Sequence, residues 1–372
     1  MLETEKRDVP DRQRSVRAVI ESSWNQVDAT TQNLLKRLSV FSGGFTRAAA
    51  QEAAGASLRG LSQLVNKVLL RRDPDTGRYS IHELLRQYAE EQLVLSADEE
   101  RSAHEDHAKY FADFMITREE HSHDNRCKAA FLEIEADFDN IRVAWNYWVG
   151  QQDTGQILRF CSVLWLFFEV RGSFTPAIQF FGDAARQLTG NEPEIVKARA
   201  QLRARQSWFT ALIGLPAEGL QMAQESLGIL RQFDRQDIGV ETFHCANINA
   251  IFMNNHEVVM QISQEMMERA ERSGDVWEHG WALIWWAYAL VLQRQVGEAL
   301  QAGQEALSIF EKLGNPFGLS VASGIILAAI SMAIGDIGAA KTHYLRGVQA
   351  AEEINYLRML QIINDNLGTV AR

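Results

Sequence analysis

Residues 281–306, WALIWWAYALVLQRQVGEALQAGQEA, hold one copy of the pattern that decides the fold. A nearly apolar run from Trp281 to Leu292 is followed by a turn at Arg294, and small residues then stand at Ala299 and Ala306. The run is too short for a membrane span, which needs roughly 20 apolar residues. It is typical of a helix that is buried on most sides inside a large helical protein.

The same arrangement occurs five times within residues 151–372. The turn stands at Gly172, Gly214, Asn254, Arg294 and Gly335; five residues later come Ala177, Gly219, Val259, Ala299 and Ala340; seven residues after those come Ala184, Ser226, Met266, Ala306 and Gly347. Successive members of the middle column lie 40 to 42 residues apart. Because paired helices approach closely only where side chains are small, the columns predict about five stacked helix pairs.

These repeats are similar to tetratricopeptide repeats, although their period is longer than the roughly 34 residues of that repeat. Longer helices or longer linkers are expected to take up the difference. The stretch after Glu352 is expected to form a final capping helix. The prediction for residues 151–372 is therefore an α-solenoid of tetratricopeptide-like helical hairpins.

A smaller unit is predicted over residues 26–95. Apolar residues recur at helical spacing up to Gly43-Gly44, and Thr46 and Ser57 are placed to cap two further short helices. Two short strands follow, at residues 69–72 and 78–81, and a turn at residues 73–77 joins them. Three helices and a hairpin predict a winged helix.

The composition of the 372-residue chain favours helix nearly throughout. It has 46% hydrophobic and 23% charged residues, six prolines and no sustained two-residue alternation, so long sheets are not expected. Residues 96–150 are expected to be a helical connector between the two predicted domains. The fold class is therefore all-α, with a small winged-helix domain followed by the solenoid.

Charge and cysteine usage exclude several classes of protein. The formal net charge of −11 argues against a dedicated nucleic-acid binder, which needs a basic surface. Cys127, Cys161 and Cys245 lie far apart without CxxC spacing, so neither a disulfide framework nor a zinc–thiolate site is expected. Residues 1–16 are charged and lack the apolar stretch of a signal peptide. The expected compartment is the cytoplasm, without a membrane association.

Residues 10–150 resemble a stretch of the STAND signal-transduction ATPases of the NB-ARC type. The motifs that carry the resemblance are Asp8-Val9-Pro10 with Arg12 and Arg14, LLKRLSVFSGGF at 34–45, LSQLVNK at 61–67, YSIHELLRQYA at 79–89 and DNIRVAW at 139–145. In that family a winged helix follows a nucleotide-binding domain, and a repeat array after it senses the effector. The resemblance implies that the winged helix and the repeat array have the same roles here. It also implies that residues 1–25 are the tail of a preceding ATPase-associated helical region.

The resemblance also implies a role for His82. The triplet Ile81-His82-Glu83 stands where the family often has Met-His-Asp, whose histidine lies near the ADP phosphates in the resting form. A histidine at this junction could instead simply cap the following helix. No GxxxxGK[ST] loop occurs, and the nearest approach, at residues 335–342, has Ala340 where the last glycine belongs. The chain is therefore expected to be a carboxy-terminal portion without the nucleotide-binding domain and without a cofactor of its own.

Two other residue groups contain residue types that occur in chemical sites. The residues His104, His107, His121, His123 and Cys127 lack established zinc spacings, so they are interpreted as a solvated surface and no metal site is expected. No GxSxG motif occurs, and the carboxylates at residues 133–139 lie in a strongly polar segment rather than in an apolar pocket. No catalytic residue is therefore expected, and the chain is not predicted to be an enzyme.

The array offers the best candidate recognition surface. Four aromatic residues follow helical spacing, and three polar residues on the preceding repeat could supply hydrogen bonds; the set is Trp277, Trp281, Trp285 and Tyr288 with His244, Asn247 and Asn249. The aromatic residues either pack between the helix pairs or line a concave groove. In the second case the groove would receive an effector protein, a peptide or a small ligand.

Three functions follow from these observations. The leading hypothesis is a sensor module of a STAND-type signalling protein, in which the array binds an effector and the winged helix relays that binding to an ATPase domain in cis or in trans. The second is a transcriptional regulator whose winged helix binds DNA. The small number of basic residues on the third helix and the hairpin disfavours it; they are Arg59, Lys67, Arg71, Arg72 and Arg78. The third is a free-standing scaffold for protein–protein interaction that uses the array alone.

Overall fold

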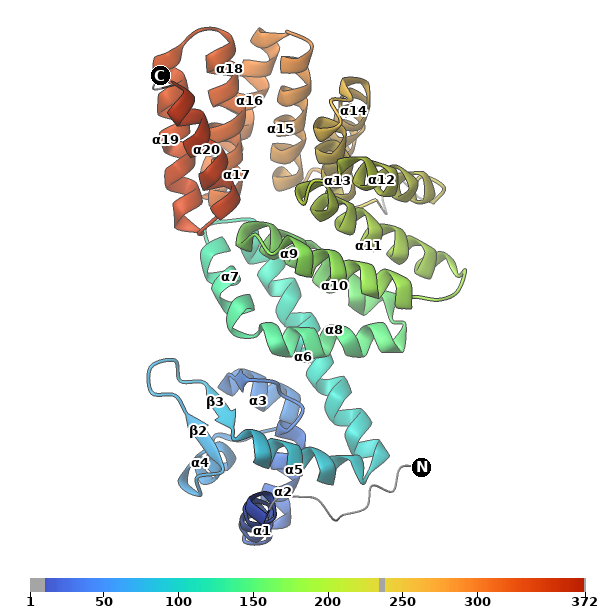
Figure 1. Ribbon diagram of the computed structural model, residues 1–372, viewed down its shortest axis with the longest axis vertical. Helices are drawn as coiled ribbons and strands as arrows, with labels where there is room; N and C mark the ends of the chain where they lie inside the picture. Colours follow the sequence, from blue (N-terminus) through green and yellow to red (C-terminus); the bar gives the residue numbers. More distant parts are fainter. Residues whose placement is uncertain (1–10, 234–237, 371–372) are drawn as a thin grey trace. The chain divides into compact units, whose positions relative to one another are not determined.

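The computed structural model describes residues 11–233 and 238–370 (Figure 1). Contacts divide these residues into two units. Unit 1 contains the described residues up to Phe114 together with Ala136–Trp148, and unit 2 contains Met115–Glu135 together with the described residues from Val149 onward. The residues expected to form a connector, 96–150, are thus shared between the two units. The motif Asp8-Val9-Pro10 lies outside the described residues.

Unit 1 consists of short capped helices around a small sheet. Its helices are α1 (Asp11–Asn25), α2 (Ala29–Leu38), α3 (Arg47–Ala54), α4 (Leu58–Asn66) and α5 (Glu83–Val94), with the first part of α6 (Ala97–Ser122) and most of α8 (Phe138–Gln151). As predicted, the hydroxyl of Thr46 accepts a hydrogen bond from the amide of Ala49, and that of Ser57 accepts one from the amide of Gly60. These caps satisfy amide groups that the first turn of a helix leaves unpaired.

The sheet of unit 1 has three strands in the order β1-β3-β2, all antiparallel. The predicted hairpin is confirmed as β2 (Leu70–Arg72) and β3 (Tyr79–Ile81). Strand β1 (Gly44–Phe45) was not predicted, because two residues are too few to show the alternation of a strand. Three helices, this sheet and its hairpin make the expected winged helix.

Polar side chains of residues 136–148 hold β1 in place. Asn140 donates from Nδ2 to the carbonyl of Gly44 (2.9 Å), and its Oδ1 accepts from the amide of Ser42 (2.8 Å). The guanidinium of Arg78 makes two hydrogen bonds to the buried carboxylate of Asp137, at 2.9 and 2.6 Å. The segment that follows α7 in the chain is therefore part of the winged-helix unit.

Unit 2 is a stack of helix pairs. Its elements are α7 (Cys127–Ala136), α9 (Thr154–Arg171), α10 (Phe174–Gln187), α11 (Pro193–Leu212), α12 (Pro216–Leu230), α13 (Val240–Phe252), α14 (His256–Ser273), α15 (Val276–Leu292), α16 (Val296–Leu313), α17 (Pro316–Val321), the π-helical turn η2 (Ala322–Leu327), α18 (Ala328–Ala333), α19 (Ile337–Glu353) and α20 (Leu357–Val370). The pairs are α9/α10, α11/α12, α13/α14, α15/α16 and α17-η2-α18/α19, and α20 follows them (Figure 1). Many of these helices have 17 to 20 residues, which accounts for the long period.

The repeat columns have the physical roles that their spacing predicted. All five turn positions have a positive φ, including the non-glycine residues Asn254 (53°) and Arg294 (62°). Every member of the two small-residue columns is buried. At Gly347 an added Cβ would lie 2.5 Å from the Cα of Gly324, so α19 and η2 approach backbone to backbone. The predicted solenoid of helical hairpins is confirmed.

One run of the described chain, Pro316–Ala333, is long and apolar enough to pass a length and hydropathy test for a membrane span. Two thirds of it is buried inside unit 2, at 67%. The inner helix of a large helical protein passes the same test.

Candidate functional site

An apolar pocket of about 220 Å³ lies among the first helices of the repeats in unit 2. Its lining comes from α9, α11, α13, α15, α17, η2 and α20, so every helix pair and the last helix contribute. The lining residues are Trp165, Trp208, His244, Ile248, Ile251, Phe252, Trp281, Ile284, Trp285, Tyr288, Phe317, Val321, Ile325, Ile326, Tyr356, Arg358, Met359 and Ile362. The stacking of the pairs therefore brings residues from the whole array to one place.

Aromatic rings pack around His244, one of the residues that line this pocket. The ring of Trp165 stacks on the imidazole with a centroid distance of 5.7 Å, and the ring of Trp281 meets it edge to face at 5.1 Å. Trp208 in turn packs edge to face on Trp165 at 5.0 Å. All four side chains are buried, which fixes their orientation.

The protonation state of His244 follows from its surroundings. Burial lowers the pKa of the imidazole to about 3, although the nearby carboxylate of Glu241 opposes the shift. The ring is therefore neutral at pH 7, and its Nδ1 accepts a hydrogen bond from the indole N–H of Trp285. Nε2 consequently carries the proton, since a neutral imidazole has one N–H. Within the described residues this N–H has no acceptor.

Two indole groups of the pocket share this property. The Nε1–H groups of Trp165 and Trp281 are buried and have no acceptor among the residues that the structure describes. By contrast, the Nε1–H of Trp208 donates to the carboxylate of Glu169 at 2.7 Å. Buried donors without a partner are uncommon because the loss of hydration is not compensated.

A buried ion pair joins α9 to α20 beside the pocket. Glu169 is fully buried and accepts hydrogen bonds from Trp208, from the hydroxyl of Tyr356 and from Nε of Arg358 at 2.6 Å. Burial alone would lower the pKa of Arg358, but the charge of Glu169 outweighs it and the pKa is raised. The positive charge of Arg358 in the pocket lining is thus neutralised by the carboxylate of Glu169.

The structure brings four of the seven predicted recognition residues to this pocket: His244, Trp281, Trp285 and Tyr288. Trp277 instead stacks on the ring of His123 at 4.0 Å. Asn247 and Asn249 do not line the pocket. Both are fully buried, and Asn249 donates to the carbonyl of Cys245 at 2.6 Å.

The remaining lining residues were not predicted from the sequence. Trp208, Ile248 and Tyr288 each stand six residues before a turn position, and this shared column could have identified the first two. Tyr356 and Arg358 follow the last repeat and carry no such signal. Their place in the pocket depends on the contact between α20 and α9.

The end of α6 packs into the array. The carbonyl of Ser122 accepts a hydrogen bond from Nδ2 of Asn315 at 2.8 Å, and a buried ion pair between Arg205 and Glu241 lies near Glu119. Burial and the charge of Glu241 raise the pKa of Glu119 to about 7. Because α6 begins in unit 1 and ends in unit 2, one continuous helix belongs to both units.

The histidine-rich segment of α6 and α7 is not the solvated surface that the sequence suggested. His107 and Cys127 are fully buried, and His123 is half-buried against Trp277. His107 and Cys127 occupy core-facing positions of helices whose neighbouring residues are charged, which hides the burial in the sequence.

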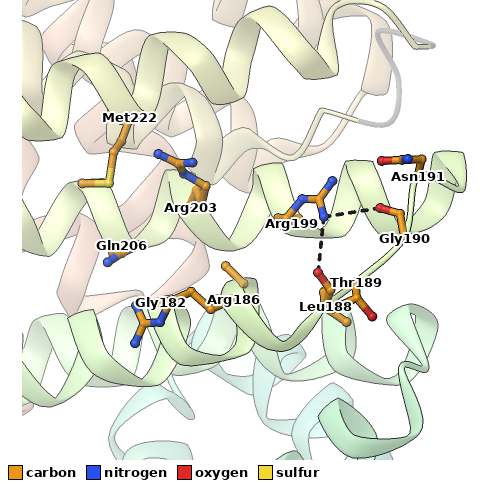
Figure 2. A pocket seen from close by; sticks show the side chains of 11 residues that line it. Gly182, Arg186, Leu188, Thr189, Gly190, Asn191, Arg199, Arg203, Gln206 and Met222 are labelled. Atoms are coloured by element: carbon orange, nitrogen blue, oxygen red, sulfur yellow. Dashed lines mark hydrogen bonds between the residues drawn. The ribbon is translucent and has the colours of Figure 1, made fainter.

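A second, larger pocket of about 670 Å³ lies on the surface of α10, α11 and α12 (Figure 2). Its arginines are engaged: Arg199 donates to the carbonyls of Leu188 and Gly190, Arg203 pairs with Glu225, and Arg186 pairs with Asp183. The cations of this pocket already have protein partners, so it is the weaker candidate for ligand recognition.

In unit 1, His82 is the N-cap of α5, and its Nδ1 accepts a hydrogen bond from the amide of Leu84 at 3.4 Å. The ring is exposed. Of the basic residues considered for DNA, four are exposed, whereas Arg78 is held by Asp137; the exposed ones are Arg59, Lys67, Arg71 and Arg72.

No protein-family model matches the chain. Proteins from Mycobacterium bovis and from two strains of Mycobacterium tuberculosis, each named "Putative HTH-type transcriptional regulator", are 28% identical to it over 211 residues. The alignment covers 54% of this chain and 20% of each relative, so the match spans about a fifth of the relatives' length.

Among solved structures, a STAND protein with a tetratricopeptide repeat sensor from Pyrococcus horikoshii aligns over 98% of this chain and 56% of its own, with a TM-score of 0.52 and 14% identity. A Rap protein complexed with competence and sporulation factor aligns over 71% of this chain and 87% of its own, with a TM-score of 0.46 and 14% identity. Only the first likeness has a TM-score above 0.5, and at 14% identity it concerns the fold alone. The chain thus has a fold similar to that of a STAND protein with a tetratricopeptide repeat sensor.

Proposed function

We propose that this chain is a regulatory sensor module whose repeat array binds an effector and whose winged-helix unit relays that binding to an ATPase domain. The observation that supports the proposal is the pocket, because all five helix pairs and α20 line it. A ligand there meets residues from several repeats and can bias their packing. The compartment that fits this function is the cytoplasm.

The relay is proposed to run through α6. In unit 2 its end is tied to the first residues of the fifth pair through the bond between Asn315 and Ser122, and the adjoining His123 stacks on Trp277 of α15. In unit 1 its beginning pairs with α2, where Lys36 meets Glu99 and Arg37 meets Asp106 at 2.6 Å. A shift of the inner helices would therefore act on a helix that unit 1 also holds.

The resemblance to STAND proteins gives His82 its proposed role. An exposed imidazole at the start of α5 is free on its Nε2 side to meet a phosphate of a nucleotide held by another domain. This chain carries no phosphate-binding loop, so the nucleotide would belong to that partner domain.

The test combines this chain with its nucleotide-binding domain and measures nucleotide exchange with and without candidate effectors. Two matched variants report on the pocket: Phe252 lines it and Ile337 does not, and both are 47% exposed. The variant Phe252→Ala should weaken effector-dependent exchange, and Ile337→Ala should leave it unchanged. Exchange that ignores this chain altogether would refute the relay.

A second candidate function is direct DNA binding, which the name of the mycobacterial relatives favours. The exposed Arg59, Lys67, Arg71 and Arg72 are the groups that would contact phosphates. Phosphate contacts release counterions, so binding would fall steeply with salt. A mobility-shift series at two salt concentrations, with Arg71→Glu as the variant, decides whether DNA is bound.

The third hypothesis, a free-standing scaffold, predicts that deletion of residues 1–95 leaves partner binding intact. The sensor hypothesis predicts that the same deletion abolishes the relay.

A further inference from the structure

The nitrogen atoms of the rings that line the pocket of unit 2 are either covered or already bonded within the protein. Nε2 of His244 and Nε1 of Trp165 and Trp281 are buried, so a molecule in the pocket cannot reach them. The indole N–H of Trp208 donates to a buried carboxylate, and that of Trp285 donates to the imidazole of His244. These five side chains therefore offer a ligand the carbon surface of their rings and no hydrogen bond.

The charges in the lining are also engaged. The imidazole of His244 is neutral because burial lowers its pKa, and Arg358 is paired with Glu169. A second anion would have to compete with Glu169 for this guanidinium. Among the described lining residues there is no carboxylate for a cation. An ionic ligand would thus lose its hydration without gaining a free partner.

One wall of the pocket is the π-helical turn η2, which interrupts the first helix of the fifth pair. Such turns are rare and are frequently found at functional sites. Ile325 and Ile326 of this turn both line the pocket. The turn is held against α19, because a Cβ added at Gly324 would lie 3.0 Å from the Cα of Gly347. The backbone of this wall is therefore fixed by close packing, and its two isoleucines limit the space for a ligand.

The volume of the pocket limits the size of the ligand. Its value of about 220 Å³ exceeds the ~150 Å³ of an engineered cavity that binds benzene, and it is smaller than the ~300 Å³ at which pockets for drug-sized ligands begin. One small ring or a short branched chain fits this space. Several lining side chains are at least partly exposed, so the pocket is open to solvent; they are Ile251, Phe252, Tyr288, Val321, Ile325 and Ile362.

We propose that this pocket binds a compact, uncharged hydrocarbon group, a small ring or a branched chain, by apolar contact alone, and that Ile325 and Ile326 of η2 set the size it accepts. The inference rests on the proposed sensor function and specifies the chemical class of its ligand. It differs from recognition of a peptide, because the amide groups of a peptide would lose their hydration and find no partner in this lining.

The experiment titrates the full chain with three probes of nearly equal shape. They are 3,3-dimethylbutan-1-ol, which is uncharged, choline, which is its cationic isostere, and 3,3-dimethylbutanoate, which is an anion. Isoleucine methyl resonances report the affinity and the place of binding together. The uncharged probe should bind at least about 10-fold more tightly than either ion, because only the ions lose the hydration of a charge. Its shifts should centre on Ile325 and Ile326.

Two variants of one residue change the space in opposite directions. Ile325→Phe fills the pocket and should weaken binding of 3,3-dimethylbutan-1-ol by about 10-fold or more. Ile325→Ala enlarges it and should shift the preference toward the larger 2-cyclohexylethanol. Ile229→Phe is the matched control, because Ile229 of α12 is also partly exposed but does not line the pocket. Circular dichroism checks that each variant is folded, and the probe series on the unchanged chain decides the ligand class without any variant.

Tighter binding of choline or of 3,3-dimethylbutanoate, or no binding of the uncharged probe, overturns this proposal. Equal weakening in Ile325→Phe and Ile229→Phe would overturn the role of η2. If the uncharged probe binds as expected while nucleotide exchange ignores the chain, the ligand site stands and the relay fails. If exchange responds to an effector while the uncharged probe does not bind, the relay stands and this ligand class is wrong.

Discussion

At the scale of single residues, the main finding is the environment of His244, which lines the pocket of unit 2 and is fully buried. Its Nδ1 fixes Trp285, and this bond forces the proton onto Nε2, where it becomes one of the unsatisfied donors. The same burial that makes the imidazole neutral also makes the folded state sensitive to acid.

The first prediction concerns pH. His244 in the folded protein has its pKa lowered to about 3 from 6.5, so between these values the unfolded chain binds more protons than the folded one. Stability is therefore complete above pH 6.5 and falls as the pH decreases toward 3, by up to about 1.4 kcal/mol per pH unit for one such group. Thermal melting at pH 7.5 and pH 5.5 measures the loss.

The matched variants separate His244 from the other histidines. His244→Gln keeps an acceptor for Trp285 and should reduce the difference between the two melting temperatures. His256→Gln changes an exposed residue and serves as the control. His107, whose pKa burial also lowers to about 3, contributes the same dependence in unit 1. An unchanged difference in His244→Gln would show that His244 is not held neutral.

At the scale of secondary-structure elements, close backbone approach determines how the fifth pair packs. Gly347 of α19 faces Gly324 of the π-helical turn η2, with no room for a side chain on either. A π-helical turn inside a first helix is a local widening that often accompanies a binding site. Here it places Ile325 and Ile326 in the pocket lining.

The second prediction tests this approach. Gly347→Ala should destabilise unit 2 by about 1–3 kcal/mol, because the new Cβ meets backbone that has no room to move. Gly228→Ala in α12 is the control, since nothing lies within 4 Å of its Cβ and alanine favours helix by up to about 1 kcal/mol. Urea denaturation of both variants measures the two opposite shifts. Stabilisation of both would mean that α19 and η2 are farther apart.

The third prediction concerns the bond between α17 and α6. Asn315 and Asn255 both cap a helix, accepting from the amides of Gly318 and Val258, but only Asn315 also donates to Ser122. Each alanine variant loses a cap worth about 1 kcal/mol, and Asn315→Ala loses a buried hydrogen bond worth about 1 kcal/mol more. Hydrogen–deuterium exchange should increase in residues 116–122 only in Asn315→Ala. Equal exchange in the two variants would contradict this attachment of α6.

The elements also show where sequence reasoning succeeds and where it ends. The positive φ of Asn254 and Arg294 follows from their place in the turn column, even though neither is glycine. Strand β1 escapes detection because Gly44-Phe45 becomes a strand only when Tyr79 and Ser80 pair with it. Periodic side chains reveal elements, whereas pairing between distant segments does not leave a periodic signal.

At the scale of the whole molecule, the array of unit 2 connects its first helix to its last. Arg171 of α9 donates to the carbonyl of Ile354 at 3.0 Å, and Glu169 binds Tyr356 and Arg358. These contacts join residues more than 180 positions apart. The places of Tyr356 and Arg358 in the pocket lining therefore could not be predicted from repeat spacing, because both residues follow the last repeat and depend on the contact between α20 and α9.

The fourth prediction tests this connection. Glu169→Gln leaves the buried guanidinium of Arg358 without its counter-ion and should destabilise unit 2 by about 3 kcal/mol. Combining it with Arg358→Met removes the unpaired charge and should recover a large part of that loss. Chemical denaturation of the single and double variants measures the difference. Additive losses would show that the pair is not formed.

The contact between α9 and α20 has a consequence for the evolution of this architecture. An open solenoid tolerates the gain or loss of a unit, since each repeat meets only its neighbours. Here the gain or loss of one unit of about forty residues would separate Arg358 from Glu169 and leave two buried charges unpaired. Lineages that keep this pair are thus bound to keep the same number of repeats.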